Sequence, residues 1–257
     1  MSDSTVIPFR PNGPLETPMV EWETMPAEEL ISEAPIQKGH EYINLPIKDN
    51  LGGRLTAGVW ECTPFETVMA PYSVHEFMHV LEGSVCIVDQ YGQNQTFRQG
   101  DSFVIPKGTI CSWKQTEYIR KFYVIFEDDF DITTLANNDL AAIRIDTKGD
   151  LPELANQDPE QFIGSVPTMH QRNDYTGSAS RFIAGVWDST AMTRVPGVIG
   201  RSELMHILEG SGSIINGDGV SFSFSAGDTF LVPMDMGYQW SSDEYVKKVF
   251  CTLIPES

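Results

Sequence analysis

The chain has 257 residues, with 36 acidic side chains against 17 Lys and Arg and a formal net charge of −19. This acidic balance argues against nucleic acid and against an anionic membrane surface as partners. No stretch approaches the run of about 18 apolar residues that a transmembrane helix needs. The first ten residues lack the pattern of a secretory signal. The four cysteines show no CxxC spacing, so we expect reduced thiols and a cytoplasmic protein.

Proline interrupts the first 35 residues, and we expect an irregular N-terminal arm there that lies over the following domain or over its copy. Short segments rich in β-branched and aromatic residues follow, separated by Gly, Asp, Asn or Pro. Two turns, at 90–93 and 216–219, have the composition of hairpin loops. Many short strands favour an antiparallel sandwich or barrel. The expected strands of the first copy are residues 55–60, 76–81, 85–88, 102–105 and 121–126.

The sequence is internally duplicated. The segment from Glu76 to Gly83 returns 127 residues later as Glu203 to Gly210, and no insertion is needed to align residues 54–126. A repeat of this length is a duplicated domain rather than a solenoid unit, which repeats at roughly 20–50 residues. Other residues kept at this shift include Trp113 with Trp240, Tyr118 with Tyr245, and Lys121 with Lys248. We therefore predict an arm over 1–35, a first domain over 36–128, a linker over 129–161 with a short helix near 133–142, and a second domain over 162–257.

Two motifs carry a family resemblance. Glu76 and Gly83 form Glu-x6-Gly, and residues 100–106 form Gly-Asp-x-Phe-x-x-Pro. Both motifs recur in the second copy, and they resemble the signatures of the cupin superfamily. Residues 58–62 and 100–108 further resemble a subgroup that includes the ureidoglycine aminohydrolases and the ethanolamine-utilisation cupin. The resemblance implies an all-β fold of two tandem cupin barrels (double-stranded β-helix, or jelly-roll) and a bicupin that forms a homodimer.

Strand alternation places Glu76, Met78 and Val80 on one face and His79 on the other. The resemblance places the Glu face inside the barrel, where a carboxylate is costly unless it meets a metal, a cation or hydrogen-bond donors. Glu76 and Glu203 are therefore the candidate catalytic residues. Arg54 and Arg181 are kept in both copies and could neutralise these carboxylates. His79 and His206 lie on the opposite, outer face and are expected to pack between barrels or on a dimer seam, each with one nitrogen hydrogen-bonded.

A metal site is a second hypothesis for the interior. The resemblance implies the metal site of metal-binding cupins, which has two His just before the Glu, the Glu itself, and a fourth ligand after the Pro-x-Gly. Here Met69 to Tyr72 stand before Glu76, and the fourth position holds Cys111. The candidate metal set is therefore His75, Glu76 and Cys111, for a divalent first-row ion (Mn, Fe, Ni or Zn). Alternation turns His75 away from the interior unless a bulge re-aims it, and a metal-free cavity is the preferred interpretation.

The remaining candidates are aromatic and polar residues near the barrel mouth, which would wall a pocket and orient a small polar ligand. Alternatively, the tryptophans fill the mouth and the lysines pair with surface acids. The ligand-binding candidates are Tyr72, Cys111, Trp113, Tyr238, Gln239 and Trp240.

Three functions are compatible with these residues. The first, implied by the aminohydrolase resemblance, is an enzyme acting on a small nitrogenous metabolite. The second is a non-catalytic protein that binds or senses a small molecule with degenerate metal sites. The third is a structural module whose barrels serve to dimerise. Because one fold hosts many chemistries, the fold alone does not decide among them.

Overall fold

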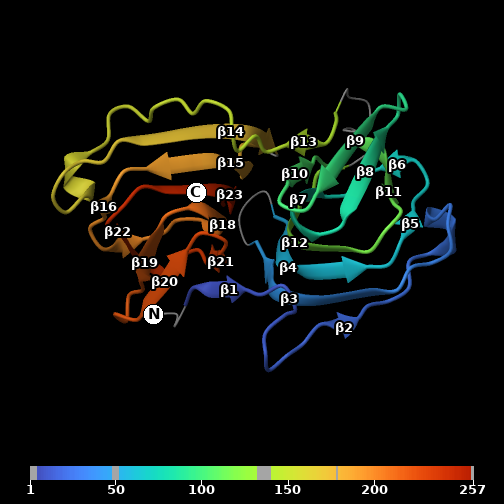
Figure 1. Ribbon diagram of the computed structural model, residues 1–257, viewed down its shortest axis with the longest axis horizontal. Helices are drawn as coiled ribbons and strands as arrows, with labels where there is room; N and C mark the ends of the chain where they lie inside the picture. Colours follow the sequence, from blue (N-terminus) through green and yellow to red (C-terminus); the bar gives the residue numbers. More distant parts are fainter. Residues whose placement is uncertain (1–4, 48–51, 132–139, 178, 256–257) are drawn as a thin grey trace. The chain divides into compact units, whose positions relative to one another are not determined.

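The computed structural model describes residues 5–47, 52–131, 140–177 and 179–255, and over these residues the chain is built from β-strands (Figure 1). It divides into two compact units: residues 9–144 form the first, and residues 145–255 with residues 5–8 form the second. The two helical segments described are single 3-10 turns, η1 (Ala27–Glu29) and η2 (Pro159–Gln161). Within the described residues no helix is long and apolar enough to span a membrane.

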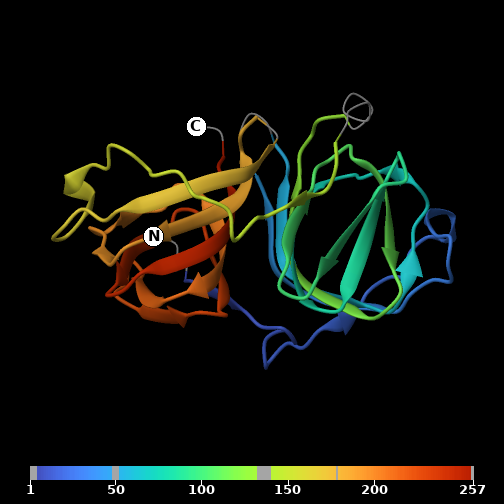
Figure 2. The same ribbon diagram turned by 45° about the horizontal axis from the view of Figure 1, so that its top comes forward.

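The first unit is a barrel of two facing sheets (Figure 2). The larger sheet has the order β13-β10-β7-β12-β4-β3-β2, and the smaller has the order β5-β11-β8-β9, with β6 paired to β11. The strands are β2 (Val20–Glu21), β3 (Gln37–Pro46), β4 (Arg54–Cys62), β5 (Phe65–Glu66), β6 (Ala70–Pro71), β7 (His75–Glu82), β8 (Ser84–Asp89), β9 (Asn94–Arg98), β10 (Ser102–Ile105), β11 (Ile110–Gln115), β12 (Ile119–Glu127) and β13 (Ile143–Arg144).

The second unit repeats this architecture. One sheet has the order β1-β21-β18-β23-β15-β14, and the other has the order β16-β22-β19-β20, with β17 paired to β22. The strands are β1 (Ile7–Phe9), β14 (Met169–Gly177), β15 (Phe182–Ser189), β16 (Met192–Thr193), β17 (Gly197–Val198), β18 (Ser202–Glu209), β19 (Ser211–Ile215), β20 (Ser221–Ser225), β21 (Thr229–Val232), β22 (Gly237–Ser242) and β23 (Val246–Leu253). The prediction of two tandem cupin-type barrels is confirmed.

Segments outside the sequence repeat complete both large sheets. β1, from the N-terminal arm, pairs with β21 of the second barrel. β13, from the segment between the repeats, pairs with β10 of the first barrel through Phe103 opposite Arg144. β10 and β21 are equivalent strands, so the same edge is covered in both barrels. A covered edge hides the unpaired N–H and C=O groups that would otherwise invite another strand.

The duplication extends further back than the 127-residue shift reveals. Residues 22–46 correspond to 154–178 at a shift of 132. The evidence is an equivalent bridge in each copy: Leu30 pairs with Thr67 in the first, and Phe162 pairs with Arg194 in the second. The shift changes because the segment between the paired Leu45 and Leu55 is five residues longer than its equivalent in the second copy. The arm and the linker are therefore equivalent segments, and each runs into its own barrel.

The predicted strands of the first copy are confirmed, each within two residues at either end. The sharp corner after β7 is confirmed as well: Gly83 has φ +76, and a Cβ there would lie 2.0 Å from the Tyr118 carbonyl oxygen, so only glycine fits. Gly210 repeats this geometry against Tyr245. The expected helix near 133–142 falls outside the described residues over 133–139, and residues 140–142 are not helical.

Candidate functional site

Each barrel carries a buried ion pair between its interior glutamate and a lysine. In the first barrel the Lys121 Nζ lies 2.7 Å from the Glu76 Oε1 and 3.0 Å from the Met78 sulfur. The pair forms because Glu76 on β7 and Lys121 on β12 both face inward from neighbouring strands. Side-chain exposure is 7% for Lys121 and 6% for Glu76. Removing one partner would leave a buried, uncompensated charge, which is strongly destabilising.

The second barrel repeats the pair. The Lys248 Nζ lies 2.7 Å from the Glu203 Oε1 and 3.2 Å from the Met205 sulfur. In both barrels the ammonium also lies close to two indole rings. Lys121 is 4.8 Å from the ring centroids of Trp60 and of Trp113. Lys248 is 4.8 Å from Trp187 and 5.2 Å from Trp240. These distances are those of cation–π interactions, which stabilise an ammonium ion that has lost its water.

The ion pair of the first barrel lies in a cavity of about 380 Å³. Three residues of the N-terminal segment, Trp22, Met25 and Glu29, line part of this cavity. The Trp22 indole packs directly against Gly39, where an added Cβ would lie 2.2 Å from the ring. The other lining residues are Gln37, Glu41, Thr56, Trp60, Phe65, Thr67, Tyr72, Glu76, Trp113, Lys121, Tyr123 and Ile125.

The charge of the first cavity is negative. Among its described lining residues the carboxylates are Glu29, Glu41 and Glu76, and the cation is Lys121. Burial raises the pKa of the Tyr123 hydroxyl, and Glu41 and Glu76 raise it further, as expected in a negative potential.

The Tyr72 hydroxyl donates a hydrogen bond to the Glu76 Oε2. Burial, and then the Glu76 carboxylate, raises the pKa of Tyr72 well above its ordinary value. The phenol therefore stays protonated near neutral pH. Glu76 thus accepts from one neutral donor and one ammonium, Lys121.

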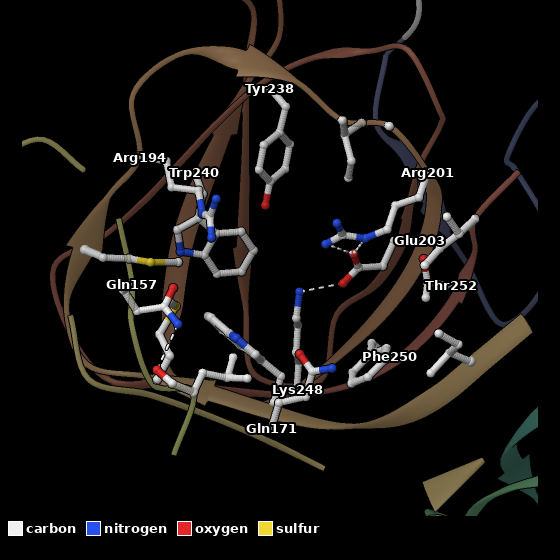
Figure 3. Close-up of a pocket in the computed structure, with 18 of the residues that line it drawn as sticks. Gln157, Gln171, Arg194, Arg201, Glu203, Tyr238, Trp240, Lys248, Phe250 and Thr252 are labelled. Atoms are coloured by element: carbon white, nitrogen blue, oxygen red, sulfur yellow. Dashed lines mark hydrogen bonds and ion pairs between the residues drawn. The ribbon is translucent and has the colours of Figure 1, made fainter. Parts of the chain in front are cut away.

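The second barrel has a cavity of about 360 Å³, shown in Figure 3. Its ion pair has a third member, because the Arg201 Nε and Nη2 both lie 2.7 Å from the Glu203 Oε2. Burial alone would raise the pKa of Glu203, but Lys248 and Arg201 outweigh burial and lower it from 4.5 to about 2. Its lining residues are Leu154, Gln157, Met169, Gln171, Ile183, Trp187, Met192, Arg194, Val198, Ile199, Gly200, Arg201, Glu203, Tyr238, Trp240, Lys248, Phe250, Thr252 and Ile254.

Six of the sequence-predicted site residues meet in the cavities. Tyr72, Glu76 and Trp113 line the first, and Glu203, Tyr238 and Trp240 line the second. Two do not. Cys111 belongs to the hydrophobic core of the first barrel, and burial raises the pKa of its thiol to about 11, so it is not a thiolate at neutral pH. The Gln239 amide donates to the Arg194 carbonyl and stays outside the cavity lining.

The expected metal set is not brought together. His75 faces away from Glu76, and its Nε2 lies 3.3 Å from the Asp128 carboxylate while its Nδ1 accepts from the Lys107 N–H. The described residues contain no group of three or more His, Cys, Asp or Glu side chains that could hold a metal ion. Both oxygens of the Glu76 carboxylate already have partners, the Lys121 ammonium on Oε1 and the Tyr72 hydroxyl on Oε2. These residues therefore do not fit a metal.

The remaining sequence hypotheses can be placed as well. Lysines, not Arg54 and Arg181, neutralise the interior carboxylates: the Arg54 side chain is hydrogen-bonded to Asn44, while Arg181 is buried outside both cavity linings. His79 and His206 lie on the outer face as expected, with Nδ1 2.9 Å from the Ser102 Oγ and 2.8 Å from the Thr229 Oγ1.

The sequence-predicted site leaves out four cavity cations, Lys121, Lys248, Arg194 and Arg201, and the arm residue Trp22. The sequence shows that Lys121 and Lys248 are kept in both copies, but this does not place them in the site. The period of two could have done so, because Tyr123 and Phe250, two residues further along the same strands, line the cavities. Arg201 stands two residues before Glu203, and the period of two was sufficient to place both on one face. No comparable signal identifies Trp22, because the changed shift hides its equivalence to Leu154.

The fold and interior now define a bicupin. The EutQ-like cupin domain family matches residues 50–123 and 176–250, together more than half of the chain. The chain belongs to this family, and it carries the domain twice.

Solved structures agree on the fold. A protein of unknown function of the DUF861 family from Pseudomonas syringae pv. tomato is 21% identical, covers 97% of this chain and 100% of its own, and has a TM-score of 0.72. A cupin 2 conserved barrel domain protein from Leptotrichia buccalis is 12% identical, covering 88% and 97%, with a TM-score of 0.56. A putative glyoxylate-induced protein from Pseudomonas aeruginosa is 13% identical, covering 91% and 93%, with a TM-score of 0.50. No curated protein matches this chain.

Proposed function

We propose that the protein binds a small nitrogenous metabolite, carried as a cation, in the cavity of its first barrel. The observation that supports this most is the combination of aromatic walls with three carboxylates against one ammonium among the described lining residues. An organic ammonium gains from aromatic faces and from nearby carboxylates at once. The volume of about 380 Å³ lies near the lower end of the range for small-molecule sites.

Each part of the cavity has a role in this proposal. Lys121 is neutralised by Glu76 and shielded by Trp60 and Trp113, so it does not repel the ligand strongly. Glu29 and Glu41 are exposed and lie at the outer part of the cavity, where they attract the cation. Trp22 closes the wall and packs edge-on against Tyr123, with ring centroids 6.2 Å apart.

The test is calorimetric titration with benzylamine, a cation at neutral pH, against benzyl alcohol, its neutral counterpart. Benzylamine should bind more tightly, and the double variant Glu29→Gln/Glu41→Gln should weaken its binding by about tenfold, equivalent to about 1.4 kcal/mol. Trp22→Ala should weaken it as well, whereas Leu154→Ala, the equivalent change in the second barrel, should not. Equal binding of benzylamine and benzyl alcohol would refute the proposal.

A catalytic function, similar to that of the aminohydrolases, is a second candidate. It is favoured by the hydrogen bond from Tyr72 to Glu76, which joins a proton donor to a carboxylate inside the cavity. In this hypothesis Tyr72 and Glu76 move a proton to or from a bound ureido or amino compound. Turnover of such compounds by the wild type, abolished in Tyr72→Phe with benzylamine binding retained, would favour the enzyme. Absence of turnover alongside tight binding would leave the binding protein.

A further inference from the structure

The second cavity carries the opposite charge from the first. Its described lining residues include the cations Arg194, Arg201 and Lys248 and a single carboxylate, Glu203. This excess of positive charge stands in a chain whose formal net charge is −19. Glu203 balances one of these charges, while Arg194 and Arg201 keep part of their surface exposed. The arrangement therefore indicates an anion that is supplied from outside the chain.

The three cations come from different elements and converge on one space (Figure 3). Lys248 lies on β23, Arg201 immediately precedes β18, and Arg194 follows β16. The Arg194 guanidinium carbon lies 5.3 Å from the centre of the Phe162 ring, and its backbone N–H donates to the Trp240 carbonyl. Burial lowers the pKa of Lys248, and Arg201 and Arg194 lower it further while Glu203 raises it. Like charges thus crowd the cavity even with Glu203 present.

Glu203 uses only one edge of the Arg201 guanidinium. Its Oε2 accepts from Nε and Nη2, which leaves the edge formed by Nη1 and Nη2 directed into the cavity. Among the described residues, Nη1 has no hydrogen-bond acceptor. Two parallel N–H groups on one guanidinium edge match the two oxygens of a carboxylate. The Arg201 side chain keeps 46% of its surface exposed, so a ligand can reach it.

Other lining groups complete a carboxylate site. The Tyr238 hydroxyl points into the cavity opposite Lys248 in Figure 3 and can donate to a second oxygen. Burial and Glu203 raise the pKa of Tyr238, while Arg194 and Arg201 lower it, which places both guanidinium groups within electrostatic reach of the phenol. Trp187 and Trp240 form an apolar wall for the body of the ligand.

The first barrel lacks this arrangement at every equivalent position. Arg194 corresponds to Thr67, Arg201 to Val74, and Tyr238 to Cys111. The Glu–Lys pair and both tryptophans are kept. The difference is therefore confined to the groups around the ion pair, and the fold of the barrel does not require it.

We propose that the second barrel is a binding site for a small organic carboxylate, held by Arg201 and Arg194 beside the Glu203–Lys248 pair. The volume of about 360 Å³ suits a small metabolite rather than a polymer. The site is independent of the one proposed in the first barrel, so either can fail without the other.

The test uses benzoate and succinate as carboxylate probes, benzamide as the neutral counterpart of benzoate, and inorganic phosphate as another anion. Binding is measured by calorimetry on the intact chain. We expect benzoate or succinate to bind the wild type at least tenfold more tightly than benzamide or phosphate. Arg201→Val and Arg194→Thr install the first-barrel residues and should each weaken carboxylate binding by tenfold or more. Trp22→Ala, which alters the first cavity, should leave carboxylate binding unchanged.

A further variant serves as a control for loss of folding. Arg201→Lys keeps a positive charge beside Glu203 but removes the two-nitrogen edge, so it should fold as the wild type and still weaken benzoate binding. Three results would overturn the proposal: no carboxylate binding by the folded wild type, binding unchanged in Arg201→Val and Arg194→Thr, or phosphate binding as tightly as the carboxylates. Loss of benzylamine binding alone would concern only the first barrel.

Discussion

The two cavities share their interior and differ around it. Both hold a glutamate–lysine pair whose ammonium lies close to two tryptophans, in matching geometry. Glu76, however, is joined by the neutral Tyr72, whereas Glu203 is joined by the cation Arg201. The outer residues then carry the difference further, with carboxylates in the first barrel and arginines in the second. Duplication has preserved what each barrel needs to fold and changed what a ligand would meet.

The largest expected difference in stability between the two barrels comes from replacing their lysines one at a time. Lys121→Met leaves Glu76 buried with only a neutral donor, and we expect a loss of about 3–5 kcal/mol in the free energy of unfolding. Lys248→Met leaves Glu203 paired with Arg201, so we expect a smaller loss of about 1–3 kcal/mol. Denaturant unfolding at neutral pH, followed by tryptophan fluorescence, measures both.

The control is the double variant Glu76→Gln/Lys121→Met, which removes both charges of the first pair. It should recover part of the loss, because no buried charge is left unpaired. If Lys248→Met were as destabilising as Lys121→Met, Arg201 would not be supporting Glu203 as described.

A second prediction uses pH. Because Arg201 and Lys248 lower the pKa of Glu203 in the folded protein from 4.5 to about 2, the unfolded chain takes up this proton first as the pH falls. The stabilisation is complete above pH 4.5 and is lost as the pH falls towards 2. It amounts to about 2–3 kcal/mol once the partial exposure of Arg201 is taken into account.

Stability curves of the wild type and Glu203→Gln between pH 5 and pH 2 measure this contribution. The variant should be less stable at pH 5, and its stability should fall less steeply with pH. Parallel curves would contradict the assigned ion pair.

The last prediction concerns the arm. Gly39 in the first barrel corresponds to Gln171 in the second, and only the glycine leaves room for an indole ring, that of Trp22. Gly39→Ala should displace Trp22 and cost about 1–3 kcal/mol through overpacking, with a shift in tryptophan emission and weaker benzylamine binding. Gln171→Ala, the matched change, should alter stability by less than about 0.5 kcal/mol. An unchanged emission spectrum in Gly39→Ala would show that Trp22 does not occupy the described seat.

Much of the fold could be predicted from the sequence, because the repeat, the turn glycines and the strand alternation all point to one architecture. The period of two predicts that Glu76 shares a face with Met78 and Val80, and the family resemblance places that face inside the barrel. The equivalence of the N-terminal arm and the linker was not predictable, since a difference of five residues in one loop changes the shift from 127 to 132 and hides this equivalence. The pairing of β1 with β21 and of β13 with β10 depends on contacts between segments far apart in the chain, which no local pattern encodes.

The site was only partly predictable. Polar residues such as Tyr72 and Tyr238 were selected because aromatic and hydroxyl groups near a barrel mouth suggest a ligand. Pairing of the lysines with surface acids is one of two alternatives that the sequence leaves open, since a lysine on a strand is usually solvated. Lys121 is buried because Glu76 lies opposite it. The homodimer stays a prediction, which light scattering at micromolar concentration can check.

The pairing of β1 with β21 and of β13 with β10 has an evolutionary consequence. The start of the gene encodes the strand that completes the sheet of the second barrel, and the segment between the repeats encodes the strand that completes the sheet of the first. A fragment that ends with the first repeat would lack β13, and a fragment that begins at residue 145 would lack β1. Either product would present a bare strand edge of the kind that promotes aggregation. The fusion of the two ancestral copies is therefore hard to reverse by gene fission, and selection acts on the pair as one heritable unit.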